Sequence, residues 1–581
     1  MQRRWTLWIG CGAAAIALLA LLVTQNPRLA ARLENLTGAP GKPIDGEITE
    51  AVTAAPEIAS SAESRLRKTP ALNRPANAAA AFAVPSPGKA YMPPRRETAW
   101  YAHYDDNPLR TVARDPRSTF SLDVNTTSYA NVRRFLNEGR LPHESAVRVE
   151  ELINYFPAAE DDRTPEPLLG SPFRAAYELA PCPWNDNGTL LWISLTAQDL
   201  DYKEAPSANL VFLVDVSGSM SPPERLPLVK AALKMLAEKM RPNDRISLVT
   251  YAGSTEVVLE AAPGNEKAKI RSAIDRLGAG GSTAGAAGLA LAYEQARRAF
   301  VEGGVNRILL CTDGDFNVGV SDPDELEAMV KRERESGVTL SVLGFGTNNY
   351  NDAMMVKISN VGNGNYSYVD SMSEARKILG EEMAATLVTV AKDVKAQIEF
   401  NPANVIEYRQ LGYEKRRLRD EDFANDAVDA GDIGAGRRVT VLYELTLAGK
   451  EPGVSPLRYQ PSSESSSVAG EGFTAAEMKE DELAYLKIRW KAANGSESSE
   501  AEMPVMKKAI SRSFEEAGTA LRFSAAVAAY GQKLRGSHNL AKTAWRQIES
   551  WADGARGNDP YRAEFLQLVK LAASLAGEKG Q

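Results

Sequence analysis

The sequence predicts an α/β protein in which a doubly wound, mostly parallel sheet is inserted in a β-sandwich, with a helical C-terminal part and a disordered N-terminal tether. Three observations lead to this fold class. Strand-like and helical signals alternate between residues 207 and 390, as in parallel sheets covered by helices on both faces. Strand-like runs flank that stretch on both sides, and Ala-rich helical patterns follow them.

Changes in composition and the positions of turn-forming residues divide the 581-residue chain into six regions. In chain order they are a membrane anchor or signal segment (1–32), a disordered Ala/Pro-rich tether (33–114), an N-terminal region with the first sandwich strands (115–199), the α/β domain (207–390), the remainder of the sandwich (391–492) and a helical C-terminal region (493–581). We expect ordered structure to begin near Ser118.

The N-terminal segment has the features of a membrane anchor. Met1-Gln-Arg-Arg4 is positively charged, and Trp5 to Val23 is uncharged and about the length that spans a bilayer. The two arginines favour a cytoplasmic start, which places the body outside the cytoplasm, in the cell envelope on the periplasmic side of the inner membrane. Cleavage as a signal peptide, or lipid attachment at Cys11, are the alternatives.

Within the α/β domain, apolar runs mark the strands and amphipathic patterns mark the helices. In Glu224 to Met240 the apolar residues share one helical face. Asp322-Pro323 followed by Glu325 predicts a helix start. The predicted strands are Asn209–Val214, Arg245–Tyr251, Glu256–Glu260, Arg307–Thr312, Thr339–Phe345 and Tyr366–Val369.

Charge and residue counts exclude several classes of function. The formal net charge of −7 argues against a nucleic-acid-binding protein. The three cysteines and three histidines are few and scattered along the sequence, which argues against a zinc hydrolase and against a His-based catalytic triad. Asp426, Asp429 and Asp432 lack the spacing of a calcium loop and are interpreted as a solvated acidic turn.

Hard oxygen donors gather in three loops at the carboxyl ends of predicted strands, where doubly wound sheets bind ligands. The first loop carries Asp215, Ser217 and Ser219, the second is glycine-rich and ends at Thr283, and the third begins with Asp313. Carboxylate and hydroxyl oxygens are ligands that Mg²⁺ or Mn²⁺ takes. The alternative is that Asp215 and the serines only cap a turn.

These five positions resemble, in order and context, the metal-ion-dependent adhesion site of the von Willebrand factor type A (VWA) domain. The resemblance implies that Ser217 and Ser219 bind Mg²⁺ directly, with Mn²⁺ or Ca²⁺ as other cations. It also implies that Thr283 binds directly or through water, and that Asp215 and Asp313 act through water.

The flanking regions resemble bacterial envelope proteins of the YfbK type. The similarity in the N-terminal region lies in Phe120 to Tyr129 and Ala146 to Phe156. In the C-terminal region it lies in Leu411-Gly-Tyr413, Asp429 to Gly436 and Val439 to Leu445. The resemblance covers roughly residues 115–581.

A cation held mainly by neutral hydroxyls keeps most of its charge, so it favours a further acidic ligand. We therefore expect a non-enzymatic, membrane-tethered envelope protein without catalytic residues. It would bind a protein partner that presents an Asp or Glu carboxylate to the cation. Two other functions remain open: a scaffold or assembly module whose metal only stabilises the loops, and, with less support, a metal-assisted hydrolase.

Overall fold

The computed structural model describes residues 101, 103–122, 125–157, 162, 164–282, 285–314, 323–346, 352–454 and 481–577. The anchor or signal segment predicted for 1–32 lies outside these ranges, as does the tether up to residue 100. Among the helices within the described ranges, none has both the length and the apolar character needed to cross a bilayer.

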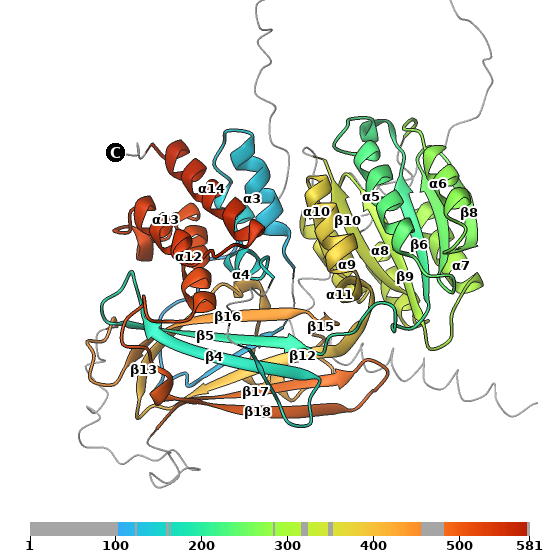
Figure 1. Cartoon of the computed structure of the whole chain (residues 1–581). Coiled ribbons are helices and arrows are strands. Elements are labelled where there is room, and N and C mark those ends of the chain that lie inside the picture. The colour runs from blue at the N-terminus through green and yellow to red at the C-terminus, as the bar shows by residue number, and fades with distance from the viewer. Residues whose placement is uncertain are drawn as a thin grey trace, which may run out of the picture. The chain divides into compact units, whose positions relative to one another are not determined.

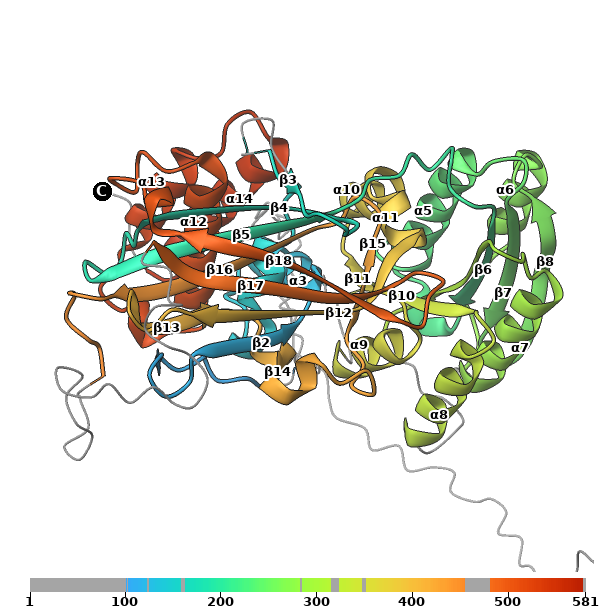
Figure 2. The ribbon, with the colours of Figure 1, turned by 90° about the horizontal axis from the view of Figure 1, so that it is seen from below.

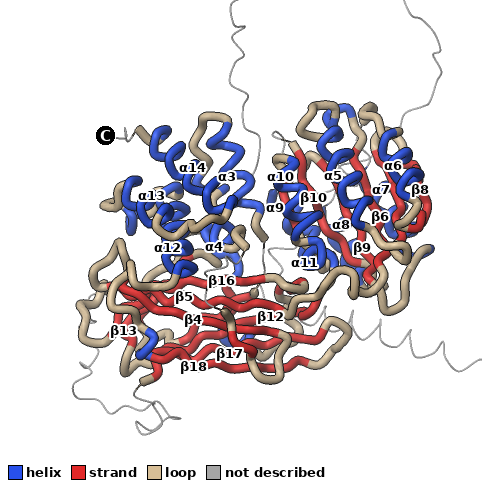
Figure 3. The backbone as a smooth tube through the Cα atoms, in the orientation of Figure 1, coloured by secondary structure: helices blue, strands red, loops and turns tan. Residues whose placement is uncertain are grey.

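The α/β domain is built on a six-stranded sheet in the order β11-β10-β9-β6-β7-β8. All neighbours run parallel except β7 and β8, which are antiparallel at one edge. Figures 1 and 3 show the helices of this domain around the sheet. The strands are β6 (Ala208–Asp215), β7 (Arg245–Tyr251), β8 (Thr255–Pro263), β9 (Val305–Thr312), β10 (Thr339–Phe345) and β11 (Tyr366–Val369).

Alternation along the central strand β6 gives the sheet two apolar faces. Leu210 and Phe212 pack in one core with α5, α6 and α10, whereas Val211 and Leu213 pack in another with α7, α8 and α9. A buried parallel sheet with helices on both faces is the doubly wound arrangement. The helices are α5 (Leu226–Lys239), α6 (Lys267–Asp275), α7 (Gly285–Arg298), α8 (Pro323–Arg334), α9 (Asp352–Val361), α10 (Met372–Arg376) and α11 (Met383–Leu387), with short turns η2 (Gly218–Met220) and η3 (Lys377–Glu381).

Two further sheets form the sandwich, and strands from before and after the α/β domain pair within each of them. In Figure 2, β2, β12 and β17 lie side by side. One sheet has the order β1-β13-β16-β5-β4-β3, with bounds β1 (Arg110–Thr111), β13 (Val405–Leu411), β16 (Arg438–Leu447), β5 (Gly188–Ala197), β4 (Phe173–Pro181) and β3 (Glu166–Pro167). The other has the order β14-β2-β12-β17-β18, with β15 paired to β12; the bounds are β14 (Arg417–Leu418), β2 (Arg117–Ser121), β12 (Thr389–Phe400), β17 (Glu482–Ala492), β18 (Ser498–Met506) and β15 (Gly431–Gly434).

The sheet that contains β5 is covered on both faces. Leu191 and Ile193 point into the core between the two sheets, and Leu190 and Trp192 point into a core shared with the helices. The predicted fold class, an α/β sheet inserted in a sandwich with a helical C-terminal part, is therefore confirmed. The covering helices are α3 (Thr127–Asn137), α4 (Val149–Ile153), α12 (Thr519–Leu534), α13 (Trp545–Asp553) and α14 (Pro560–Leu575); the remaining short turns are η1 (Glu144–Ala146), η4 (Glu414–Arg416), η5 (Asp420–Phe423), η6 (Lys507–Ala509) and η7 (His538–Leu540).

Two expectations about element positions differ from the structure. The region after residue 493, expected to be helical, begins with β18, because Ala501, Met503 and Val505 alternate toward the sandwich core and Pro504 is tolerated on an edge strand. The folded body also begins before the expected end of the tether at residue 114. Asn107 is buried and its side chain donates to Gln410 O and Gly412 O at 3.1 and 2.7 Å.

Candidate metal centre

The topology brings the two predicted carboxylate ligands to one edge of the α/β sheet. Asp215 is the last residue of β6, which pairs in parallel with β9, and Asp313 directly follows β9. Both side chains are buried, at 0% and 1% exposure. Because neighbouring parallel strands end at the same edge, residues distant in sequence become neighbours there.

The first loop folds its oxygen atoms toward one another. The backbone N–H of Ser217 donates to Asp215 Oδ1 at 2.8 Å, which holds the start of the loop against the end of the strand. The hydroxyl oxygens of Ser217 and Ser219 lie 3.0 Å apart. Ser217 is buried, Ser219 is half-buried and Gly218 between them is exposed, so this oxygen cluster reaches the surface at one point.

The glycine-rich second loop lies against the first. Gly218 N–H donates to Gly281 O at 3.1 Å, and Gly280 N–H donates to Val216 O at 2.7 Å. Gly281 has a φ of +86°, and a Cβ atom there would lie 3.1 Å from the backbone nitrogen of Gly253, so a side chain would be strained. Thr283, the predicted ligand from this loop, lies outside the described residues.

Asp215 carries a carboxylate that the protein satisfies only in part. Burial raises its pKa to about 6; hydrogen bonds from Ser217 and the Tyr251 hydroxyl offset this in part, and the negative charge of Asp313 adds to it. Its Oδ2 atom is buried and has no hydrogen bond of ordinary geometry among the described residues. An incompletely satisfied carboxylate beside two clustered hydroxyls is a donor set that fits a hard divalent cation.

Arg225 is a member of this site that the sequence analysis did not identify. Its Nη1 donates to Asp313 Oδ2 at 2.5 Å and to the Ser219 carbonyl oxygen at 2.7 Å. The sequence offered only a weak signal, namely a positive charge near the start of the helix predicted from Glu224, where it is unfavourable to the helix dipole. In the structure Arg225 is the N-cap residue of α5, and Asp313 compensates its charge.

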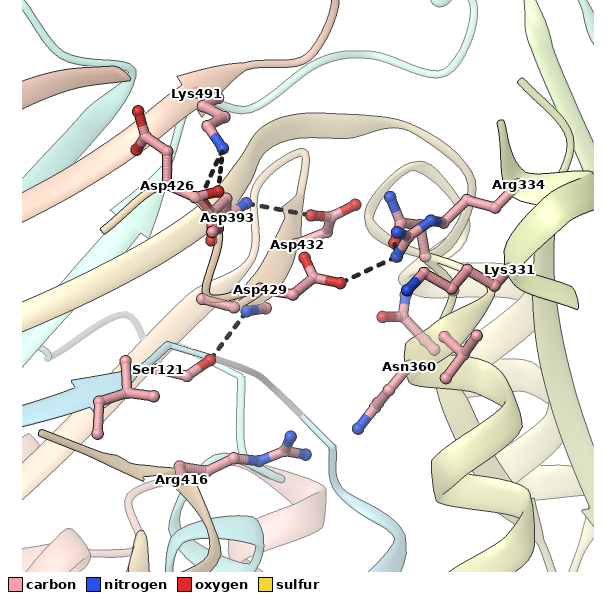
Figure 4. Close-up of a pocket in the computed structure, with 18 of the residues that line it drawn as sticks. Ser121, Lys331, Arg334, Asn360, Asp393, Arg416, Asp426, Asp429, Asp432 and Lys491 are labelled. Atoms are coloured by element: carbon pink, nitrogen blue, oxygen red, sulfur yellow. Dashed lines mark hydrogen bonds and ion pairs between the residues drawn. The ribbon is translucent and has the colours of Figure 1, made fainter. Parts of the chain in front are cut away.

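A polar cavity of about 600 Å³ lies elsewhere, lined by α8, α9 and the sandwich loop that precedes β15. Figure 4 shows Asp429 paired with Arg334, at 2.9 Å, and Asp432 accepting from the backbone N–H of Asp393 at 3.2 Å. The interpretation of this loop as a solvated acidic turn is wrong for Asp432, because this residue is half-buried on β15 and the loss of solvent around its carboxyl group raises its pKa to about 7. None of the described candidate metal ligands lines this cavity.

Across the described part of the chain, no group of three or more His, Cys, Asp or Glu side chains is arranged to hold a metal ion. The candidate centre differs in kind, because hydroxyl oxygens form much of its donor set. Its described members are Asp215, Ser217, Ser219 and Asp313.

The fold and the arrangement of these loops define a protein built around a VWA domain. A family model described as "von Willebrand factor type A domain" matches residues 209–381. A second, described as "von Willebrand factor", matches residues 95–192, and a third, described as "Uncharacterized protein YfbK, C-terminal", matches residues 385–575. VWA domains generally mediate protein–protein interaction.

Similarity to one relative extends over most of the sequence. The chain is 54% identical over 515 residues to the protein YfbK of Escherichia coli K12, covering 88% of this chain and 85% of that protein. The chain therefore belongs to the YfbK family, as its flanking motifs predicted. It is also 26% identical over 272 residues to human inter-alpha-trypsin inhibitor heavy chain H3, covering 43% of this chain and 30% of that one.

Solved structures are similar at lower identity. A von Willebrand factor type A protein from Catenulispora acidiphila is 15% identical, with a TM-score of 0.36, covering 72% of this chain and 89% of that one. Proximal thread matrix protein 1 from the mussel byssus, described with a zinc-occupied MIDAS motif, is 23% identical, with a TM-score of 0.26. That match covers 32% of this chain and 46% of the mussel protein.

Proposed function

We propose that this chain is a non-enzymatic envelope protein that binds a protein partner through a divalent cation, with Mg²⁺ as the expected ion. Asp215, Ser217, Ser219, Thr283 and Asp313 would hold the cation, and an Asp or Glu carboxylate of the partner would complete its ligands. The observation that carries this proposal is the buried Oδ2 of Asp215, which lacks a well-formed hydrogen bond beside two hydroxyls 3.0 Å apart.

Charge and access both support a carboxylate as the missing ligand. Serine hydroxyls are neutral, so they leave most of the charge of a bound Mg²⁺ uncompensated. The exposed Gly218 and the half-buried Ser219 give a partner a way to the cluster from solvent. A compact anionic side chain that approaches there would meet an electropositive ion with a replaceable water.

The alternatives have less support. A metal that only stiffens the loops is not required, because the Gly218–Gly281 and Gly280–Val216 hydrogen bonds already join the first two loops. A hydrolase would need an activated nucleophile. Cys311 lies close in sequence to Asp313, but burial raises the pKa of its thiol to about 12, so it is not a nucleophile near neutral pH.

Cation binding is tested first on the purified chain. We expect calorimetric titration with MnCl₂ or MgCl₂ to show one site in the wild type, and the Ser217→Ala variant to lose at least about tenfold in affinity. Ser221→Ala is the matched control, because this exposed serine is two residues beyond Ser219 and only donates to Gly218 O. Equal affinity for all three proteins would contradict the assigned ligand set.

Partner binding is tested with the full chain in envelope extracts. We expect a partner to be retained by the wild type in Mg²⁺, and released both by EDTA and by the Asp215→Ala substitution. Blocking the carboxylates of the extract proteins by amidation should abolish retention. A partner that the Asp215→Ala chain retains equally well in EDTA would favour the scaffold function instead.

We also propose that residues 1–32 tether the chain to the inner membrane with its body in the periplasm. The basis is the positively charged start followed by the apolar stretch Trp5 to Val23. Alkaline phosphatase fused after residue 581 is expected to be active and to sediment with membranes. Activity in the soluble periplasmic fraction would indicate cleavage instead.

A further inference from the structure

Arg225 is a buried, positively charged residue inside the candidate metal centre, and the backbone around it leaves space for its side chain. Its side chain is 10% exposed, and its donor Nη1 connects the loop after β6, through Ser219 O, with the loop after β9, through Asp313 Oδ2. The guanidinium therefore already provides one positive charge where the proposed divalent cation would provide two.

The third contact of Arg225 is with Gly346, at the end of β10. This glycine has a φ of +86°, and a Cβ atom on it would lie 2.4 Å from Arg225 Nε and 2.8 Å from its Cγ. Any other residue at this position would displace the arginine stem. The Gly346 backbone is itself held by the Tyr368 hydroxyl, which donates to Gly346 O at 2.5 Å.

The arginine is held in place but not fully paired. Its Nε is buried and has no hydrogen-bond partner within the described ranges. A buried guanidinium with an unused donor, in the same site as a carboxylate that lacks a well-formed hydrogen bond at one oxygen, is an unusual combination, since buried polar groups are usually hydrogen-bonded. Among the described residues, the Nε of Arg225 has no hydrogen-bond partner, and the Oδ2 of Asp215 lacks one of ordinary geometry.

We propose that Arg225 is a built-in counter-charge that weakens cation binding at this site and makes it depend on the partner. By neutralising Asp313, the guanidinium leaves Asp215 as the one uncompensated carboxylate of the described ligands. Its positive charge also repels the incoming ion. Without a cation, the same ion pair keeps the loops after β6 and β9 together.

A site weakened in this way gains most from a third negative charge. The partner's carboxylate restores the attraction that Arg225 removes, so cation and partner strengthen each other's binding by the same factor. The inference rests on the proposed function, because it requires that a cation binds here. It adds how that binding is regulated: the cation is retained mainly when the partner is present.

The test is a titration of the full chain with Mn²⁺, followed by electron paramagnetic resonance of the free ion. We expect the Arg225→Met variant to bind Mn²⁺ at least about tenfold more tightly than the wild type, because one repulsive charge is gone and Asp313 is released. Arg225→Lys keeps the charge and is expected to retain an affinity within about threefold of the wild type. Arg271→Met, which removes a charge from a 54% exposed side chain of the same domain, is the matched control.

Thermal unfolding in EDTA gives a second readout. Arg225→Met is expected to melt below the wild type in EDTA and to recover most of the difference in Mn²⁺. Should this variant fail to fold, Arg225→Gln keeps a donor for Ser219 O and is expected to show the same tighter binding. Wild-type Mn²⁺ binding together with unchanged or weaker binding by the neutral variants would overturn the inference alone. Absence of Mn²⁺ binding in every protein would overturn the proposed function as well.

Discussion

Two buried arginines, Arg133 and Arg225, lie in two different kinds of polar site. Arg133 on α3 is fully paired: it donates to Asp370 at 2.8 and 2.6 Å, to Glu374 at 2.7 Å, to Glu564 at 3.0 Å and to the Tyr155 hydroxyl at 3.1 Å. These partners come from the end of the VWA sheet, from α10, from α14 and from the segment after α4. The arginine therefore ties α3 to four other segments of the fold.

Arg225 is also buried, with a side chain 10% exposed against 5% for Arg133, but it is poorly paired. It uses one nitrogen for Asp313 and Ser219, while its own Nε and the Oδ2 of Asp215 in the same site lack well-formed partners among the described residues. A polar cluster that satisfies itself stabilises the fold and needs nothing further. A cluster that leaves donors and acceptors unused is a place where a ligand fits, and this difference separates the structural arginine from the one in the candidate metal centre.

The largest expected effect is on the fully paired site. Arg133→Met leaves three carboxylates around a neutral side chain, and removal of one partner from a buried ion cluster costs about 3–5 kcal/mol. We expect a lower thermal midpoint, and separate unfolding of the VWA domain and the helices because their shared ion cluster is lost. Arg140→Met, at a 44% exposed side chain, is the control. Mn²⁺ affinity at the candidate centre should not change; a tenfold loss would contradict the separation of the two sites.

At Asp215 we expect the opposite result, a small change in stability and a large change in cation affinity. Asp215→Asn keeps the acceptor for the Ser217 N–H and removes a charge that is incompletely satisfied. Stability in EDTA should therefore change by less than about 1 kcal/mol, whereas Mn²⁺ affinity should fall at least about tenfold.

Asp244 is the matched control for Asp215. This aspartate of the same domain is also buried, but Arg241, Tyr202 and the backbone N–H of Ala208 pair with it at 2.8, 3.0 and 2.9 Å. Asp244→Asn should destabilise the chain and leave cation binding intact. If Asp215→Asn unfolded the chain in EDTA as much as Asp244→Asn does, Asp215 would be a capping residue instead of a ligand.

A smaller, pH-dependent effect is expected at Glu382, which joins the VWA domain to the sandwich. Burial alone would raise its pKa, but Lys377 and Arg437 overcome this and lower the pKa to about 2. For an acid with a lowered pKa in the folded state, the stabilisation is present above about pH 4.5 and is lost as the pH falls toward 2. Glu382→Gln should lower the free energy of unfolding by about 2 kcal/mol at pH 7. It should also reduce the fall of the urea-unfolding midpoint as the pH is lowered from about 4.5 toward 2. If the urea midpoint of the variant fell with acid as steeply as that of the wild type, this ion cluster would not be what stabilises the junction between the VWA domain and the sandwich.

The smallest expected effect concerns Asp432, at the polar cavity of Figure 4. Burial raises its pKa to about 7, so the folded chain holds its proton more strongly than the unfolded chain does. Stability is consequently lost as the pH rises from about 4 through 7. Asp432→Asn should match the wild type at pH 4 and exceed it by about 1 kcal/mol at pH 8, as measured by urea unfolding. A variant less stable than the wild type at pH 8 would contradict this.

Much of the fold could be read from local patterns. Asn209–Val214 was predicted as a strand and is β6 with one more residue at each end, because an uninterrupted apolar run is typical of a strand buried on both faces. The helix predicted from Asp322-Pro323 begins at Pro323. Strand β18 was missed because its alternation is short and is interrupted by charged residues and by Pro504, which weaken the strand signal.

Part of the candidate centre could also be predicted from local sequence patterns. Asp215, Ser217 and Ser219 occupy a contiguous motif, and the parallel topology predicts that a residue after β9 lies beside it. Arg225 was not predicted, because nothing local connects it to Asp313, 88 residues further along the chain. A positive charge near the predicted start of a helix was the one sequence signal against a plain surface role.

The sequence by itself determined which oxygen donors are available, the alternation that makes the VWA sheet, and the family to which the chain belongs. These follow from short-range spacing, which fixes strand ends and loop chemistry. Only the tertiary structure decided how charges compensate one another: Arg133 with Asp370, Glu374 and Glu564, and Arg225 with Asp313. Electrostatic pairing depends on distance in space and on burial, and neither can be read from separation along the chain.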